Sequence, residues 1–274
     1  MPELPEVETV RRGLTSGVVG RAIVQVTVRE HRLRWPIPAG FGGELVGATI
    51  AALDRRGKYL LFRLDDGRTL LCHLGMSGQL RWCRPGAAPA VQRHDHVDIS
   101  FDDGSLLRYC DPRRFGALLL YAGPDGEQRL LAHLGAEPLT EAFTAHRLKR
   151  SIAGRRTAIK AALMDAEVVV GVGNIYANEA LFRAGIRPTT PAGRLGLARC
   201  ERLVAAVKDV LADAIEAGGA SLRDFVHADG GSGYFQLDCL VYGRGGEPCR
   251  VCAAPLKAIR QIGRSTVYCP RCQR

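Results

Sequence analysis

The first six residues, Met1 to Glu6, read MPELPE and place a proline imino group beside carboxylates. Pro2 is small enough to follow the usual removal of an initiator methionine, which would expose its ring nitrogen. An α-amino group has a pKa near ~8, against ~10.4 for a lysine side chain, so part of it is unprotonated at neutral pH. Such an amine can attack an electrophilic carbon and form an iminium intermediate. The alternative is that Pro2 and Pro5 only begin a helix, whose first turn favours proline and acidic residues.

Four of the nine cysteines form two C-x2-C pairs with 16 residues between them: Cys249, Cys252, Cys269 and Cys272. This spacing is typical of a tetrahedral zinc site built from two knuckles. Four thiolates leave no coordination position open, so we expect one structural Zn²⁺ per chain. Nine cysteines in a cytosolic chain argue against a disulfide framework. The other five, which are Cys72, Cys83, Cys110, Cys200 and Cys239, are predicted to be buried or incidental thiols.

Basic residues exceed acidic ones by 38 to 28, which gives a formal net charge of +10 and a pI near 9.4. This balance favours a polyanionic partner, usually a nucleic acid, although charge alone does not establish one. The sequence contains no signal peptide and no apolar run near the ~20 residues of a membrane span. We therefore expect a cytoplasmic protein without a membrane partner, and a monomer because no feature indicates a subunit interface.

The first half of the chain predicts one helix followed by short antiparallel strands. The helix is expected from Pro2 to about Leu14. Val24, Val26 and Val28 then alternate with polar residues, which is the period of a half-buried strand. Two hairpins are expected where strand-like runs flank Asp-Gly turns: 59–64 with 69–74, and 97–101 with 106–109. Residues 15–122 are thus predicted to form an antiparallel sandwich or barrel.

The second half, from about Arg129 to Leu222, is predicted to be helical. Helices are expected at Thr157–Asp165 and at Asn174–Ala184, with Asn174 as the N-cap and Gly185 after the end. An apolar stripe from Leu203 to Ile215 predicts a further helix that ends at Gly218 and Gly219. The glycine-rich segment 224–234 is expected to be mobile.

Between two of these helices the run Val168 to Tyr176 reads VVVGVGNIY. Propensity alone predicts a strand for the valines. The glycines and the following helix start indicate instead a tight connection that directs backbone N–H groups at an anion such as phosphate. An ordinary helix connection explains this segment equally well.

Taken together, these motifs resemble the formamidopyrimidine-DNA glycosylase family over essentially the whole chain. The motifs that carry the resemblance, besides the four cysteines, are PELPEVE from Pro2, RGKYL from Arg56, HLGMSG from His73, HDHVD from His94, DPRRFG from Asp111 and GVGNIY from Gly171. The resemblance implies an α+β multidomain enzyme. Its parts would be an N-terminal antiparallel β-sandwich with an N-terminal helix (1–122), a linker (123–130), a helix–two-turns–helix domain with a lesion-capping loop (131–239) and a β zinc finger (240–274).

The resemblance also implies an activity and a partner. The chain would excise oxidised purines, 8-oxoguanine and formamidopyrimidines, from damaged double-stranded DNA that runs through a cleft between the domains. The target nucleotide must leave the base stack because its sugar carbon is hard to reach inside a duplex. The Pro2 nitrogen would attack C1′, and the iminium would allow β,δ-elimination of both flanking phosphates.

The same resemblance assigns roles to individual residues. Glu3 would be the general acid, and Glu6 would hold the first helical turn or the developing cation. Lys58 and Arg264 would contact phosphate and donate protons during elimination, although Lys58 by itself would be taken for a solvated lysine in a basic turn. Met76, Arg113 and Phe115 would fill the space that the flipped base leaves. The remaining expected DNA contacts are His94, Arg155, Lys160 and Asn174.

Two rival interpretations stay open. A relative of the same fold that prefers oxidised pyrimidines, endonuclease VIII, typically begins Pro-Glu-Gly-Pro-Glu, whereas this chain has Leu4 at the third of those positions. A non-catalytic DNA-binding zinc protein is the rival from another class. The presence of Pro2, Glu3 and Lys58 argues against it.

Overall fold

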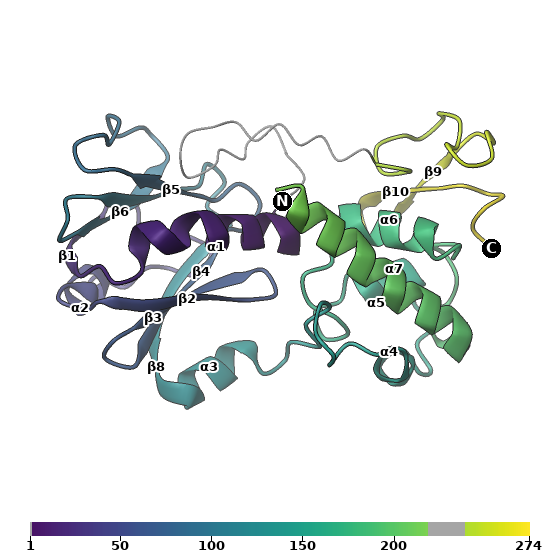
Figure 1. Cartoon of the computed structure of the whole chain (residues 1–274), viewed down its shortest axis with the longest axis horizontal. Coiled ribbons are helices and arrows are strands. Elements are labelled where there is room, and N and C mark those ends of the chain that lie inside the picture. The colour runs from purple at the N-terminus through teal and green to yellow at the C-terminus, as the bar shows by residue number, and fades with distance from the viewer. Residues whose placement is uncertain (1, 219–238) are drawn as a thin grey trace. The chain divides into compact units, whose positions relative to one another are not determined.

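The computed structural model describes residues 2–218 and 239–274, which fall into two compact units (Figure 1). Of these residues, the first unit contains Pro2 and 6–132, and the second contains Glu3–Pro5, 133–218 and 239–274. Helix α1 (Leu4–Val18) therefore begins in the second unit and continues in the first. It begins two residues later than predicted and ends about one turn later, at Val18 instead of Leu14. The proposed lesion-capping loop lies largely outside the described residues.

The first unit is an antiparallel sandwich, as predicted, and buried side chains from both of its sheets join one hydrophobic core. The strands of one sheet, in spatial order, are β1 (Ile23–Val28), β6 (Asp95–Phe101), β7 (Leu106–Cys110) and β5 (Gln79–Cys83). Those of the other are β2 (Ile50–Arg56), β3 (Tyr59–Leu64), β4 (Arg68–His73) and β8 (Ala117–Ala122). Helix α2 (Phe41–Leu45) lies against β1.

Both predicted hairpins are present, as β3–β4 and β6–β7, but the alternation predicted for β1 is not clean. Val24 is 52% exposed, and the pairing of β1 with β6 shifts register between Ile23 and Gln25. An irregularity of this kind inserts an extra residue and breaks the two-residue period. The buried position is consequently Ile23.

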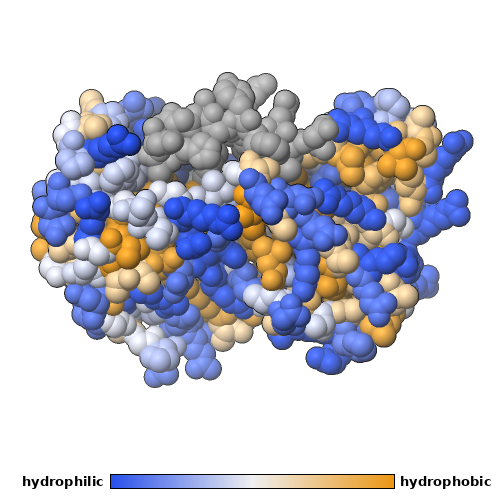
Figure 2. All heavy atoms as spheres, viewed as in Figure 1, coloured by the Kyte–Doolittle hydropathy of each residue, from blue (hydrophilic) through white to orange (hydrophobic). Residues whose placement is uncertain are grey.

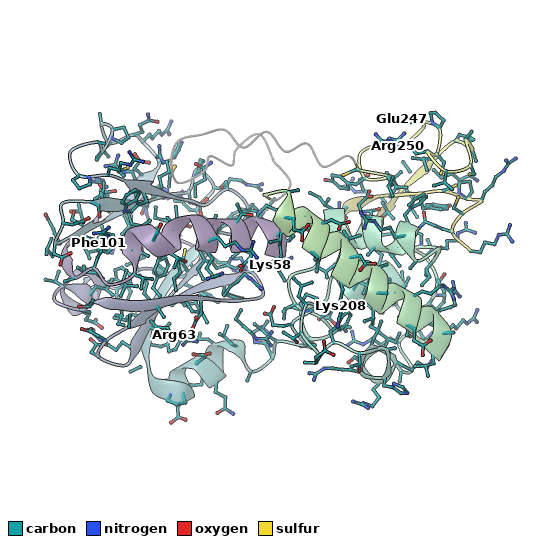
Figure 3. The ribbon with its side chains drawn as sticks, viewed as in Figure 1. Lys58, Arg63, Phe101, Lys208, Glu247 and Arg250 are labelled. Carbon is teal, nitrogen blue, oxygen red and sulfur yellow. The ribbon has the colours of Figure 1, made fainter. Side chains whose placement is uncertain are left out.

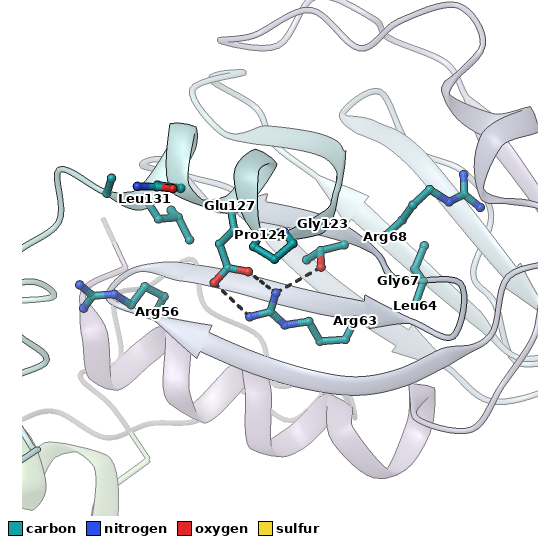
Figure 4. A pocket seen from close by; sticks show the side chains of 12 residues that line it. Arg56, Arg63, Leu64, Gly67, Arg68, Gly123, Pro124, Glu127 and Leu131 are labelled. Carbon is teal, nitrogen blue, oxygen red and sulfur yellow. Dashed lines mark hydrogen bonds and ion pairs between the residues drawn. The ribbon is translucent and has the colours of Figure 1, made fainter.

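Residues 123–130, predicted as a linker, instead belong to helix α3 (Gly123–Leu131) of the first unit. Pro124 lies in its first turn, where proline is favoured. Glu127 accepts hydrogen bonds from the Arg63 guanidinium, and this ion pair ties α3 to the sheet (Figure 4). Residues of α3 and of the sheet line an open pocket of about 700 Å³. Figure 4 shows the side chains that line it.

The second unit is helical, as predicted. Its elements before residue 219 are α4 (Ala145–Ser151), α5 (Ile159–Leu163), α6 (Asn174–Arg183), the 3-10 turn Ala192–Arg194 and α7 (Leu197–Glu216). The buried faces of α4, α6 and α7 share one core. Gly185 and Gly218 follow α6 and α7 with φ of +68° and +83°, the left-handed conformation in which glycine commonly ends a helix.

The chain ends in a small β module attached to α6. Strands β9 (Lys257–Gln261) and β10 (Arg264–Tyr268) pair antiparallel around a turn in which Ile262 and Gly263 have φ of +44° and +74°. Two α6 side chains anchor this module: Asn178 Oδ1 accepts the Val267 N–H at 2.9 Å, and the Glu179 carboxylate accepts three backbone N–H groups of residues 240–242.

Figure 2 shows hydrophilic side chains over much of the visible surface. Among the helices described, none has the length and apolar character needed to span a membrane.

Candidate functional site

The carboxylate of Glu3 occupies the N-terminus of α6, within the second unit. It accepts the N–H groups of Gly173 at 2.7 Å and Ile175 at 3.0 Å, with a weaker contact to Tyr176 at 3.5 Å. The residue is 2% exposed. A helix N-terminus favours an anion because its first N–H groups lack partners within the helix. The expected anion-directed loop is therefore present, and its anion in this structure is a carboxylate of the chain itself.

This arrangement corrects the prediction that Asn174 caps α6. The N-cap is Gly173, which has no side chain to accept a hydrogen bond, and Asn174 is the first helical residue. Glu3 takes over the function of a capping side chain from a distant part of the sequence. Sequence reasoning could not foresee this because caps are normally sought next to the helix that they close.

Two glycines allow Glu3 and Leu4 to approach this loop closely. A Cβ at Gly173 would lie 2.2 Å from Glu3 Cδ, and one at Gly171 would lie 2.5 Å from Leu4 Cδ1. Gly171 also has φ of +82°, and its carbonyl accepts the Leu4 N–H at 3.0 Å. Gly171 and Gly173 are thus required because a side chain at either position would collide with Leu4 or Glu3. A strand at Val168–Val170 is not formed apart from one bridge at Val169.

Pro2 and Glu6 are both buried. Glu8, which was given no role from the sequence, is the centre of an ionic network that fixes α1. Its carboxylate accepts hydrogen bonds from Arg11, Arg12 and Arg55, and Arg55 belongs to β2. Burial alone would raise the pKa of Glu8, but these hydrogen bonds outweigh it and hold the pKa at about 2.

Lys58 lies in the turn between β2 and β3 (Figure 3), where Gly57 adopts φ of +57°. His73, at the end of β4, pairs with Tyr59 in the β3–β4 hairpin, and their rings lie 4.8 Å apart. Burial lowers the pKa of His73 to about 4, with further lowering by the charges of Lys58 and Arg34. The imidazole is therefore neutral at neutral pH. Its Nδ1 accepts the Gly75 N–H at 3.1 Å, which puts the proton on Nε2.

His73 is a polar residue beside Lys58 that was not among the candidates. The predicted hairpin contained the signal that could have found it. Strands at 59–64 and 69–74 around a turn at Asp66 place residue 73 opposite residue 59, and hence next to Lys58.

The three residues expected to fill a vacated base position lie on two neighbouring loops of the first unit. Arg113 stacks over the Phe115 ring with 4.7 Å from Cζ to the ring centroid, and Phe115 is 45% exposed. Met76 is half-buried. His94 is also half-buried, with its ring 6.3 Å from that of His96. The structure thus brings Arg113 and Phe115 together at the surface.

Lys160 differs from the expectation of a direct phosphate contact. It is fully buried, and its ammonium donates to Asn174 Oδ1 at 2.6 Å, Thr266 Oγ1 at 2.6 Å and the Ser265 carbonyl at 3.0 Å. An ammonium has three N–H groups, so all of them are engaged within the protein. Burial, followed by the charge of Arg264, lowers the pKa of Lys160 to about 8, while Glu3 opposes this shift. Lys160 therefore connects Asn174 to the β10 strand that begins with Arg264.

Arg155 is half-buried in the second unit and forms an ion pair with Asp165 at 2.6 Å. This pair spans the residues on either side of α5. A surface ion pair of this kind contributes little to stability, about 0–1 kcal/mol.

The four candidate metal ligands converge in the C-terminal module. The Sγ atoms of Cys249, Cys252, Cys269 and Cys272 all lie within 4.8 Å of one another. Two of the pairs are 3.4 and 4.0 Å apart, near the ~3.8 Å edge of a tetrahedron with Zn–S bonds of ~2.3 Å. The residues fit one structural zinc ion.

A β-sandwich, a helical unit and a four-cysteine finger together define a multidomain zinc protein. Three family models match in the same order. They describe the formamidopyrimidine-DNA glycosylase N-terminal domain (residues 1–118), the formamidopyrimidine-DNA glycosylase H2TH domain (134–226) and a zinc finger found in FPG and IleRS (246–274). The chain belongs to the formamidopyrimidine-DNA glycosylase family.

Relatives and solved structures agree with this membership. The formamidopyrimidine-DNA glycosylases of Methylococcus capsulatus and Alkalilimnicola ehrlichii are 56% and 57% identical to this chain, with full coverage of both sequences. The MutM (FPG) protein of Thermus thermophilus is 41% identical with a TM-score of 0.87, covering 99% of this chain and 98% of that one. A Lactococcus lactis FPG mutant in complex with Fapy-dG DNA is 35% identical with a TM-score of 0.91, and both chains are fully covered.

Proposed function

We propose that this protein is a base-excision DNA glycosylase that removes oxidised purines, 8-oxoguanine and formamidopyrimidines, from duplex DNA and then cleaves the strand at the abasic site. Membership of the family supports the activity, and solved relatives hold DNA with Fapy-dG or an abasic site. The observation that carries the proposal is the Glu3 carboxylate, which is fixed by backbone N–H groups immediately after Pro2.

The proposed reaction begins with the Pro2 nitrogen. Its lone pair forms a bond to C1′ of the damaged nucleoside. The C1′–base bond breaks at the same time, and the base leaves with the electron pair of the broken bond. Opening of the sugar ring converts the adduct to an iminium. The iminium accepts the electrons released when a C2′ proton is removed, so the 3′ phosphate leaves first and the 5′ phosphate follows.

Glu3 is suited to proton transfer at the sugar ring. Its carboxylate accepts two backbone N–H groups and is held in place directly after Pro2 in the chain. It can therefore accept the proton that the Pro2 nitrogen loses as it becomes a nucleophile. The same proton can then pass to O4′ as the ring opens, so one carboxylate acts first as base and then as acid.

The DNA contacts are proposed to come from both units. Lys58, His94, Arg155, Asn174 and Arg264 provide phosphate or DNA contacts, and Met76, Arg113 and Phe115 fill the space that the extruded nucleotide leaves. Lys160 acts by positioning Asn174 and the Arg264 strand, because its N–H groups are already engaged. We further propose that the enzyme works as a monomer on chromosomal DNA in the cytoplasm.

Borohydride trapping tests the reaction. With the Met1-processed enzyme and a duplex that carries 8-oxoguanine, reduction of the iminium should give a covalent protein–DNA adduct. Pro2→Gly should weaken trapping sharply. A small amount of adduct can still form, because the variant retains a primary amine. Failure of the processed wild type to form any adduct contradicts the proposal, and so does a mass spectrum in which the active enzyme retains Met1.

Competing excision tests the substrate class. Equal amounts of duplexes with 8-oxoguanine and with thymine glycol are offered together, and the proposed enzyme should consume the first much faster. A preference for thymine glycol would support the endonuclease VIII-like alternative instead.

A further inference from the structure

Asp111 is a fully buried acid that the proposed reaction does not use. It follows β7, and its carboxylate accepts three hydrogen bonds. The Ser77 hydroxyl donates to Oδ1 at 2.6 Å, while the Gly116 N–H and the Tyr109 hydroxyl donate to Oδ2 at 2.8 and 3.1 Å. Burying a carboxylate costs free energy unless hydrogen-bond donors surround it, so Asp111 depends on these three donors.

Ser77 connects Asp111 to a second loop. While its hydroxyl donates to Asp111, its oxygen accepts the Arg113 N–H at 3.1 Å. We name residues 74–78 the first probe loop, which carries Met76, and residues 111–116 the second probe loop, which carries Arg113 and Phe115. Asp111 and Ser77 thus join the two probe loops by hydrogen bonds.

The backbones of the probe loops are also in direct contact. A Cβ at Gly75 would lie 2.4 Å from the carbonyl carbon of Phe115, and Gly75 has φ of +61°. A Cβ at Gly116 would lie 1.9 Å from the Tyr109 hydroxyl. These two glycines permit the approach, and the Asp111 carboxylate fills the polar space that remains.

Asp111 is itself fixed to the sandwich through its main chain. Its N–H donates to the His94 carbonyl at 3.1 Å, and its carbonyl oxygen contacts His96 Nε2 at 2.8 Å. The same carbonyl accepts the Arg114 N–H at 3.1 Å, which closes the turn in which Arg114 has φ of +55°. Burial raises the pKa of Tyr109, so its hydroxyl remains a donor.

We propose that Asp111 is a positioning residue that holds both probe loops as one rigid body, so that Met76, Arg113 and Phe115 enter the DNA stack together. This inference rests on the proposed function, in which these three side chains occupy the space of the flipped nucleotide. A loop that is already ordered loses less conformational entropy when it inserts, so base extrusion is faster.

Asp111→Asn is nearly isosteric but cannot satisfy the same donors. If the amide oxygen faces Gly116, the NH2 group faces Ser77, whose hydroxyl proton then has no acceptor. If the amide is flipped, its NH2 group faces the Gly116 N–H, so two donors oppose each other without an acceptor. A buried donor without a partner costs about 1–3 kcal/mol, which corresponds to roughly 5–160-fold in a rate or equilibrium constant.

The test compares two duplexes, one with 8-oxoguanine opposite cytosine and one with a preformed abasic site. Asp111→Asn should lower kcat/KM for the first by about 10–100-fold but change strand cleavage of the second by less than about threefold. The abasic site has no base to unstack, so it depends less on ordered probe loops. A 2-aminopurine next to the lesion should also brighten more slowly with the variant, since its fluorescence reports unstacking.

Ser77→Ala provides a second variant in case Asp111→Asn fails to fold, and it should show the same selective loss. Asp102→Asn is the matched control, because Asp102 is an exposed acid in the turn that follows β6. Equal loss on both duplexes, or no loss on either, overturns the inference. A wild type that excises no lesion contradicts the proposed function itself and is thereby distinguished from failure of this inference.

Discussion

The carboxylate of Glu3 and the backbone N–H of Gly173 lie 2.7 Å apart although 170 positions separate them in the sequence. This hydrogen bond places the residue after the candidate nucleophile on the positive end of α6. Asn174 begins the same helix and accepts a hydrogen bond from Lys160. The N-terminus of α6 therefore positions both Glu3, the proposed proton-transfer group, and Asn174, a proposed DNA contact.

Gly173→Ala should displace the Glu3 carboxylate and lower stability by about 1 kcal/mol, because α6 then loses the group that caps it. The new Cβ would fall 2.2 Å from Glu3 Cδ, so the carboxylate must move away from its N–H donors. We expect the excision rate to fall by about 10–100-fold, a range typical for loss of a positioned proton-transfer group. Single-turnover excision kinetics measure this effect.

Gly196→Ala is the matched control, since Gly196 precedes α7 and a Cβ there meets nothing within 4 Å. It should react at the wild-type rate. A Gly173→Ala enzyme as fast as this control would show that the position of Glu3 is not important for the reaction.

Glu8→Gln should lower stability by about 2 kcal/mol at pH 7, because the folded protein loses a carboxylate whose pKa is well below that of the unfolded chain. The folded value is about 2 against an ordinary 4.5. The stabilisation by Glu8 is therefore complete above pH 4.5 and is lost as the pH falls towards 2. Urea unfolding of both proteins at several pH values measures it. A stability difference that stays constant from pH 7 to pH 3 would exclude this origin.

Lys160→Met should lower activity and change the alkaline stability profile. The pKa of Lys160 is about 8 in the folded protein and near 10.5 in the unfolded chain, so between these values the unfolded chain binds one more proton. The contribution of Lys160 to stability therefore increases with pH across this window. The variant should lack that increase and should bind DNA more weakly, since Asn174 and Ser265 lose their shared donor.

The comparison uses thermal unfolding of wild type and variant from pH 7.5 to 10.5, with DNA affinity measured in parallel. Lys208→Met is a suitable control because Lys208 lies on α7, far along the sequence from this cluster (Figure 3). Parallel stability profiles for wild type and Lys160→Met would contradict the assignment.

Removal of zinc should abolish DNA binding while leaving the sandwich folded. Four thiolates hold the finger together, and its small apolar cluster cannot hold it without the metal. Metal analysis should find about one zinc per chain, and Cys252→Ser should contain much less. The DNA affinity of Cys252→Ser should fall together with its zinc content.

Cys83→Ser serves as the control for this experiment, because Cys83 belongs to β5 and lies outside the cysteine cluster. It should keep its zinc and its affinity. A Cys252→Ser protein with full zinc content would show that the four-cysteine site is assigned wrongly.

Features that depend on neighbouring residues could be predicted from the sequence. The cysteine spacing indicated the zinc site, and the Asp-Gly turns indicated both hairpins, because turns and knuckles are short-range structures. Helix α3 was missed since Gly123-Pro124-Asp125-Gly126 is typical of a turn. Its helix is stabilised by the contact of Glu127 with Arg63 on β3, which local propensity does not contain.

The sequence by itself determined the family, the division into sandwich, helical part and finger, and the residue types available for chemistry. Only the tertiary structure decided that Glu3 caps α6, that Lys160 is buried and that Asp111 joins two loops. Each of these depends on a polar group meeting donors or acceptors from distant segments. Burying a charged group is costly unless it is hydrogen-bonded, so each of these groups needs partners in the folded protein. The local sequence does not specify which distant residues will be those partners.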